Sequence, residues 1–100
     1  MFIHCVYFWL KPGLSKDQVH LFTRGLQSLV GIEIVRMGYF GTPAGTDRPI
    51  IDRSYSYALV CVFDGKEGHD AYQIHPDHDV FRDECGDLWD QVRIYDFEQA

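Results

Sequence analysis

The sequence predicts an α+β fold of the ferredoxin-like kind, with strands and helices in the order β-α-β-β-α-β. The chain has 100 residues, of which 46% are hydrophobic and 15% aromatic, which suffices for one core but not for two. Segments of strand-like composition alternate with segments of helical periodicity. This order is typical of a four-stranded antiparallel sheet that carries its helices on one face. We therefore expect residues 1–100 to form a single domain.

The first strand is expected over residues 2–10, which are rich in aromatic and β-branched side chains and end at a Lys-Pro-Gly turn. Both of its faces are apolar. One carries Phe2, His4, Val6, Phe8 and Leu10, and the other carries Ile3, Cys5, Tyr7 and Trp9. Ser15 and Gln18 then form a capping-box pattern, and apolar residues at helical spacing continue to Gly31. The first helix is predicted between these positions.

The rest of the chain predicts three more strands and a broken helix. We expect a strand over residues 32–41, a loop with two prolines over residues 42–53, and a clearly alternating strand over residues 55–63. Asp64 and Glu67 form a helix-start pattern, and Pro76 must split the helix that follows, with His75 at the break. The second piece is expected to turn Phe81, Cys85, Leu88 and Trp89 inward. Residues 92–97 alternate again and predict the last strand.

Helices in so short a chain can cover only one face of the sheet. The other face would then be an exposed apolar patch made of Ile3, Cys5, Tyr7, Trp9, Ala58, Val60 and Val62. A patch of this kind marks an interaction surface, so the sequence predicts a homodimer that pairs sheet to sheet.

Composition excludes several classes of partner. A net charge of −6 leaves no basic surface for nucleic acid or for an anionic membrane. No apolar stretch approaches the ~20 residues of a membrane-spanning helix, and we read no signal peptide at the start. Three cysteines without a Cys-x-x-Cys spacing are typical of a reducing compartment, which favours a cytoplasmic location. We read all three cysteines as small core hydrophobes.

Four segments of the chain resemble the stress-responsive A/B barrel (Dabb) family. They are the opening Ile3–Gly13, the strand Arg53–Val60, the Tyr-x-x-His-Pro-x-His segment from Ala71 to His78, and the closing Leu88–Val92. The resemblance implies a ferredoxin-like subunit whose sheet pairs with that of a second copy to close a dimeric α+β barrel. It implies no single activity, since the family includes stress-induced proteins without assigned chemistry as well as a plant polyketide cyclase.

The residues themselves predict a pocket between the sheet and the helices. His4 and Tyr57 are expected to point from their strands toward Tyr72 and His78. The pocket would be lined by Phe8, Phe22, Leu26, Leu59 and Phe81, giving a mostly apolar site with a few polar groups. Such a site suits an aldol step, because a neutral histidine can take a carbon-bound proton and a tyrosine hydroxyl can donate to the enolate oxygen.

The resemblance implies roles for these residues. His78 matches the general base of the plant cyclase, Tyr72 its carbonyl-polarising partner and His4 a supporting histidine. Two positions depart from it, because Tyr57 stands where the cyclase has a histidine and Gly25 where it has a tyrosine. The site is therefore carried over to this chain, as a cofactor-independent cyclase or lyase, but the substrate is not.

Other interpretations stay open. His4 and His78 can instead be core histidines satisfied by hydrogen bonds, in a non-catalytic stress or structural dimer. A cofactorless monooxygenase is a third reading, by analogy of fold alone. The cluster of His75, Asp77, His78 and Asp79 does not predict a metal site, because a proline-interrupted turn does not place these residues on one face. His20 and His69 are expected to be solvated helix residues. No cofactor is expected.

Overall fold

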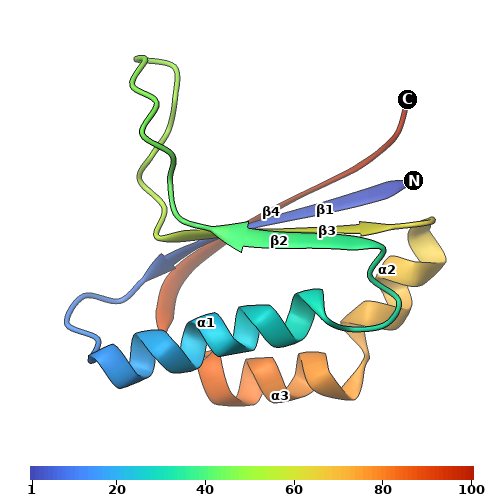
Figure 1. Cartoon of the computed structure of the whole chain (residues 1–100), viewed down its shortest axis with the longest axis horizontal. Helices are drawn as coiled ribbons and strands as arrows, with labels where there is room; N and C mark the ends of the chain where they lie inside the picture. Colours follow the sequence, from blue (N-terminus) through green and yellow to red (C-terminus); the bar gives the residue numbers. More distant parts are fainter.

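The computed structural model describes all residues from Met1 to Ala100 (Figure 1). Its elements are β1 (Phe2–Leu10), α1 (Lys16–Val30), β2 (Met37–Gly41), β3 (Tyr57–Phe63), α2 (Lys66–Gln73), α3 (Pro76–Cys85) and β4 (Trp89–Glu98). The strands form one antiparallel sheet in the order β2-β3-β1-β4, and the helices lie on one side of it. The ferredoxin-like α+β fold predicted from the sequence is confirmed.

The alternation of β1 separates the two faces of the sheet as predicted. Phe2, Val6 and Phe8 are buried beneath the helices, and His4 lies in the same row with 3% of its surface exposed. The intervening residues of β1 are half-buried on the opposite face. Because β1 pairs with both β3 and β4, it occupies the middle of the sheet and brings His4 to the centre of the fold.

Local sequence signals set the helix starts, with one exception. The Ser15 hydroxyl accepts from the Gln18 N–H while the Gln18 side chain accepts from the Ser15 N–H, so the capping box is confirmed. His75 caps α3, with Pro76 as the first helical residue. The helix start predicted at Asp64 was wrong, because Gly65 occupies the cap position of α2. Asp64 instead pairs with Arg36, which directly precedes β2.

Three strand boundaries also differ from the prediction. β2 begins at Met37 rather than at residue 32, because Ile32 is buried in a turn where its N–H bonds the Leu29 carbonyl. The apolar side chain of Ile32 packs into the core beneath the end of α1 and does not belong to a strand. β3 begins two residues after Tyr55, and β4 begins at Trp89, three residues earlier than predicted.

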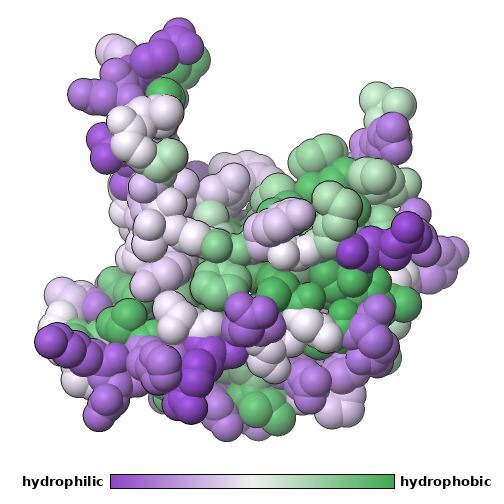
Figure 2. Space-filling model, viewed as in Figure 1, coloured by the Kyte–Doolittle hydropathy of each residue, from purple (hydrophilic) through white to green (hydrophobic).

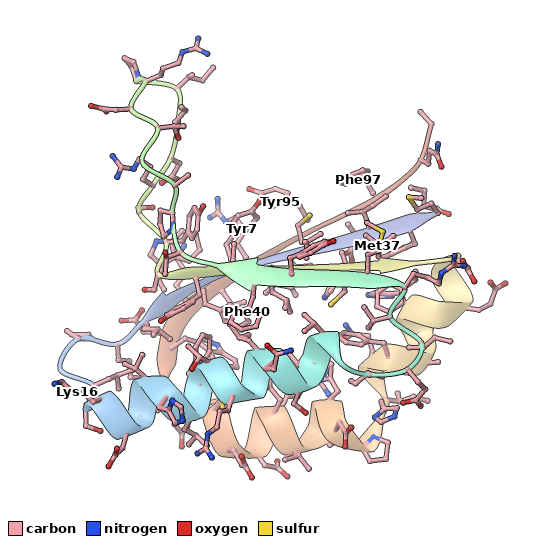
Figure 3. The ribbon with its side chains drawn as sticks, in the orientation of Figure 1. Tyr7, Lys16, Met37, Phe40, Tyr95 and Phe97 are labelled. Atoms are coloured by element: carbon pink, nitrogen blue, oxygen red, sulfur yellow. The ribbon has the colours of Figure 1, made fainter.

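One face of the sheet is left without a covering layer in the single chain. Tyr7, Met37, Tyr95 and Phe97 point away from the helices, whereas Phe40 points toward them (Figure 3). We call this surface the open face. Pale and green residues of neutral to high hydropathy occupy it beside the projecting loop of residues 42–56, while the outer surfaces of the helices are largely hydrophilic (Figure 2). None of the helices has the length and apolar character that crossing a membrane requires.

A glycine fixes the distance between α1 and the sheet. A Cβ added at Gly38 would lie 2.7 Å from the Val30 Cβ and 3.2 Å from its Cα, so neither side can yield without moving backbone. We expect Gly38→Ala to lower the free energy of unfolding by about 1–3 kcal/mol, the usual range for overpacking. Gly41→Ala in the same strand is the matched control, since a Cβ there meets nothing within 4 Å. Urea unfolding of both variants checks this, and equal stability would contradict it.

Candidate functional site

A cavity of about 180 Å³ lies between β1, β4 and the first turns of α3. Five predicted site residues line it, namely His4, Phe8, Leu59, His78 and Phe81. The wall is completed by Val6, Leu29, Gln73, Arg82, Trp89, Val92 and Ile94. Val92 and Ile94 face the helix side of β4 yet remain 41% and 52% exposed, because β4 is an edge strand that the helices do not fully cover. The cavity is therefore largely apolar and lies beneath this uncovered edge.

His78 projects from the first turn of α3 and is the unsatisfied polar group of this cavity. Its side chain is 9% exposed, and its Nδ1 atom is buried without a hydrogen-bond partner. The ring stands edge-on to Tyr72, with centroids 4.8 Å apart. Burial, and next the positive charge of Arg82, lower the pKa of His78 to about 4. The imidazole is therefore neutral at pH 7, and its Nδ1 is enclosed by the protein without a partner.

His4 is held by a carboxylate from the neighbouring strand. Asp96 lies directly opposite His4 in the pairing of β1 with β4, and its Oδ1 is 2.5 Å from the His4 Nδ1. Burial lowers the pKa of His4, and the hydrogen bond that its ring donates to Asp96 acts in the opposite direction. The contact between Nδ1 and Asp96 fixes the orientation of the His4 ring. It leaves the second ring nitrogen, Nε2, outside this contact, and His4 is one of the residues that line the cavity.

Tyr72 lies behind His4 and His78 and is fully buried. Its ring is edge-on to both histidines, at 5.8 Å from His4 and 4.8 Å from His78. Its hydroxyl lies 3.9 Å from the sulfur of Cys61, and Tyr72 is not among the residues that line the cavity. Burial raises the pKa of Tyr72 well above its ordinary value. The geometry makes Tyr72 a support for the two imidazoles.

A cation lines the cavity where the sequence predicted none. The guanidinium of Arg82 donates to the carbonyl of Gln73 and to its side-chain oxygen, at 3.4 and 3.2 Å, and is half exposed. These two bonds tether the end of α3 to the end of α2. The cavity thus combines an apolar body, a neutral imidazole and a positively charged group.

The structure brings together some of the predicted site residues and separates others. His4, Tyr72 and His78 form one row of contacting rings. Tyr57 lies apart from that row and packs against Phe22 at 5.4 Å between centroids. Phe22 and Leu26 are fully buried core residues that do not line the cavity.

Gly25 does not belong to the wall of this cavity. A Cβ at Gly25 would lie 2.7 Å from the ring of Phe81 and 3.1 Å from the sulfur of Cys85, so the residue permits the close approach of α1 and α3. It lines a separate depression of about 470 Å³ between these helices, together with Arg24, Asp77 and other surface residues. A tyrosine at this position would not fit against Phe81 as it lies here.

Asp96 and Arg82 were not predicted as site residues from the sequence. Asp96 lies on the same face of the last strand as Val92 and Ile94, and the strand register places it opposite His4. Asp96 is a polar residue in an otherwise apolar row, and it lies opposite the polar His4 of the first strand. Aligning the first and last strands in the sequence to find such opposed polar pairs could have revealed it. Arg82 gave no such signal, because an arginine on a helix is ordinarily solvent-exposed.

The lowered pKa of His78 predicts a dependence of stability on pH. The pKa of His78 is about 4 in the folded protein and 6.5 in the unfolded chain. Above pH 6.5 the imidazole is neutral in both states, so its contribution to the free energy of unfolding is fully present there. That contribution is lost as the pH falls from 6.5 toward 4, and its full size is on the order of 3 kcal/mol. The free energy of unfolding of the wild type should therefore fall further over this interval than that of His78→Leu. Parallel pH profiles of the two proteins in urea titrations would contradict a neutral, buried His78.

Comparison with known proteins places the chain among proteins of the same fold. A dimeric ferredoxin-like protein of unknown function from Thermobifida fusca is 25% identical, with a TM-score of 0.78 over 98% of this chain and 90% of that chain. A Dabb family protein from Mesorhizobium loti is 23% identical, with a TM-score of 0.78 over 99% and 96%. A hydroxynitrile lyase from Passiflora edulis is 17% identical, with a TM-score of 0.78 over 96% and 90%. No curated protein matches the sequence.

The family assignment rests on nearly the whole chain. Residues 2–99 match the model of the stress responsive A/B barrel domain, and that range contains every strand, every helix and all residues of the cavity. The fold and the order of elements agree with the solved structure from the same family. The chain belongs to the stress-responsive A/B barrel (Dabb) family.

Proposed function

We propose that the chain binds a small hydrophobic carbonyl or aromatic compound in the cavity beneath β1 and β4, and that His78 acts on it as a general base. The position of His78, an imidazole kept neutral at pH 7 by burial, in the wall of a largely apolar cavity carries this proposal. Its Nδ1 is enclosed by the protein without a hydrogen-bond partner, and leaving a buried polar group unpaired costs about 1–3 kcal/mol. With Nδ1 enclosed, Nε2 is the ring nitrogen assigned here to take the proton of a ligand in the cavity.

The size of the cavity limits the ligand. Sites for drug-sized molecules usually measure about 300–1,000 Å³, whereas a dry cavity of about 150 Å³ holds benzene. With about 180 Å³, this cavity is suited to a single aromatic ring or a short acyl chain. This size speaks against the polycyclic phenols that a cofactorless monooxygenase reading would require.

The lining residues suit removal of a proton from carbon beside a carbonyl. In this step the neutral His78 takes the proton, and the electron pair of the broken C–H bond moves into an enolate whose negative charge lies on oxygen. Arg82 is the charged group placed to stabilise that oxygen. The enolate carbon then attacks a second carbonyl of the same molecule and closes a ring, and the alkoxide formed there takes back the proton that His78 removed. No cofactor takes part in this balance.

Tyr72 and His4 act through position in this proposal. The Tyr72 hydroxyl faces Cys61, so the geometry favours Arg82 over Tyr72 as the group that polarises the carbonyl. The Tyr72 ring supports the edge of His78, and His4 is oriented by Asp96 at the opposite wall. Lyase chemistry would use the same groups in reverse, breaking a carbon–carbon bond next to a carbonyl or hydroxyl. The Passiflora protein, named as a hydroxynitrile lyase, is consistent with a lyase on this fold.

A homodimer is the assembly that the open face supports. The residues of this face include Tyr39, Tyr95 and Phe97, which are 64%, 55% and 55% exposed in the single chain. An exposed aromatic surface of this kind favours association, and the Thermobifida relative is described as dimeric. The same face is the observation that favours the second candidate function, a non-catalytic stress or structural dimer. That candidate predicts no ligand in the cavity.

Fluorescence of Trp89 tests ligand binding directly, because Trp89 lines the cavity and Trp9 lies on the opposite face of the sheet. In a Trp9→Phe background, we expect acetophenone to change the emission of Trp89 in a saturable manner. A two-ring naphthyl ketone should bind much more weakly. The same titration with His78→Leu separates filling of the cavity from contact with the imidazole. No saturable change with any single-ring ketone or phenol would favour the non-catalytic dimer.

A further inference from the structure

Two histidines and a carboxylate converge at the end of the sheet near α2, and of these three only His4 was predicted as a site residue from the sequence. His4 comes from β1, His69 from α2 and Asp96 from β4, and their ligand atoms all lie within 4.8 Å of one another. His69 is not the solvated helix residue that the sequence suggested. Its side chain is only 16% exposed, and its ring stacks on Phe2 with centroids 4.5 Å apart.

The hydrogen bonds around His69 leave one nitrogen facing a carboxylate. Its Nδ1 lies 3.1 Å from an oxygen of Asp70, whose other oxygen is held by Lys66 at 2.7 Å. A proton on Nδ1 satisfies Asp70 and leaves a lone pair on Nε2. That Nε2 is 3.8 Å from the Oδ2 of Asp96, so a lone pair faces a carboxylate oxygen. A lone pair and a carboxylate oxygen that face each other in this way can both coordinate one cation.

We propose that His4, His69 and Asp96 bind a divalent transition metal ion. Two imidazoles and one carboxylate are a common ligand set for such ions, and they leave positions open for water or another ligand. Ligand atoms about 2.1 Å from a tetrahedral ion lie about 3.4 Å from one another. The observed Nδ1–Oδ1 and Nε2–Oδ2 distances of 2.5 and 3.8 Å lie on either side of this value. Binding would replace the hydrogen bond between His4 and Asp96, and the partly exposed His69 and Asp96 side chains must move to bring all three ligand atoms to this spacing.

Asp70 supplies the outer part of the site. Metal-bound histidines usually donate their second ring N–H to a carboxylate, which fixes the tautomer and strengthens the ligand. The Nδ1 of His69 makes this contact with Asp70. The three ligands come from positions 4, 69 and 96, so no local spacing in the sequence could reveal them. The proposal does not rest on the chemistry assigned to His78.

Isothermal titration of the wild-type protein with Zn²⁺ at pH 7.5 tests the site, with Co²⁺ absorption as a second readout of ligand geometry. We expect one ion per chain. His69→Gln and Asp96→Asn should abolish this binding, and Asp70→Asn should weaken it roughly 10- to 100-fold, as outer carboxylates do elsewhere. Circular dichroism confirms that each variant is folded.

His75→Gln is the matched control, because His75 also faces a carboxylate, Glu33 at 3.2 Å, but has no second histidine beside it. This variant should bind Zn²⁺ like the wild type. The proposal is overturned if the wild type binds no Zn²⁺. It is also overturned if His69→Gln binds as tightly as the wild type, or if His75→Gln loses the ion.

Discussion

His78→Leu is expected to stabilise the protein by about 1–3 kcal/mol while abolishing any activity of the cavity. The gain arises because leucine removes a buried nitrogen that has no hydrogen-bond partner, at a cost of that size, and keeps an apolar side chain against Tyr72 and Phe81. For a domain of this length, each kcal/mol raises the melting temperature by roughly 4–8 °C. Thermal unfolding of both proteins at equal concentration and pH 7 measures the effect.

The sign of this change separates the two candidate functions. A histidine kept for structure loses its interactions when it is replaced, so the variant would be less stable. A histidine kept for chemistry carries a cost in stability, as residues of active sites often do. A lower melting temperature for His78→Leu would therefore contradict the general-base proposal. His75→Leu is the matched comparison, because His75 caps α3 and its loss should destabilise the fold.

Val60→Asp is expected to convert the homodimer proposed above into monomers. Val60 lies on the open face in the strand β3, directly opposite Cys5 of β1 and Tyr39 of β2. In an interface with two-fold symmetry the new carboxylate appears twice, and each copy would be buried without a partner. A cost of about 2 kcal/mol for each copy weakens association about a thousandfold. Sedimentation velocity across a range of protein concentrations measures the change.

Val80→Asp is the control for this substitution. Val80 is a valine of α3 that is 50% exposed on the helical side of the molecule, far from the open face. Its replacement should leave the dimer intact. If Val60→Asp sediments as a dimer, or if the wild type is a monomer at micromolar concentration, the open face is not the interface.

Much of the fold could be predicted because each element carries a local signal. The two faces of β1, the capping box at Ser15 and the break at His75 are set by residues close together in the sequence. The errors arose where tertiary contacts decided the outcome. Ile32 looks like a strand residue but fills the core below α1, and Asp64 looks like a cap but pairs with Arg36.

The candidate site was predictable to a smaller extent. His4 and His78 were placed in one cavity because the strand alternation and the proline break determine where they point. The contribution of β4 was not predictable in the same way, because it depends on the register between the first and last strands of the chain. That register pairs His4 with Asp96 and adds Val92 and Ile94 to the wall. Tyr57 was also predicted for the pocket but does not line this cavity, and its side chain packs toward Phe22.

The exchange of carbon-bound protons tests the central claim without knowledge of the natural substrate. Acetophenone is a single-ring ketone whose methyl protons exchange slowly with solvent, and NMR in D₂O follows their loss. We predict that the wild type accelerates this exchange and that His78→Leu returns it to the background rate. His75→Gln, which removes a histidine outside the cavity, should exchange like the wild type. Equal exchange with the wild type and His78→Leu would show that His78 is not a base toward a bound ketone.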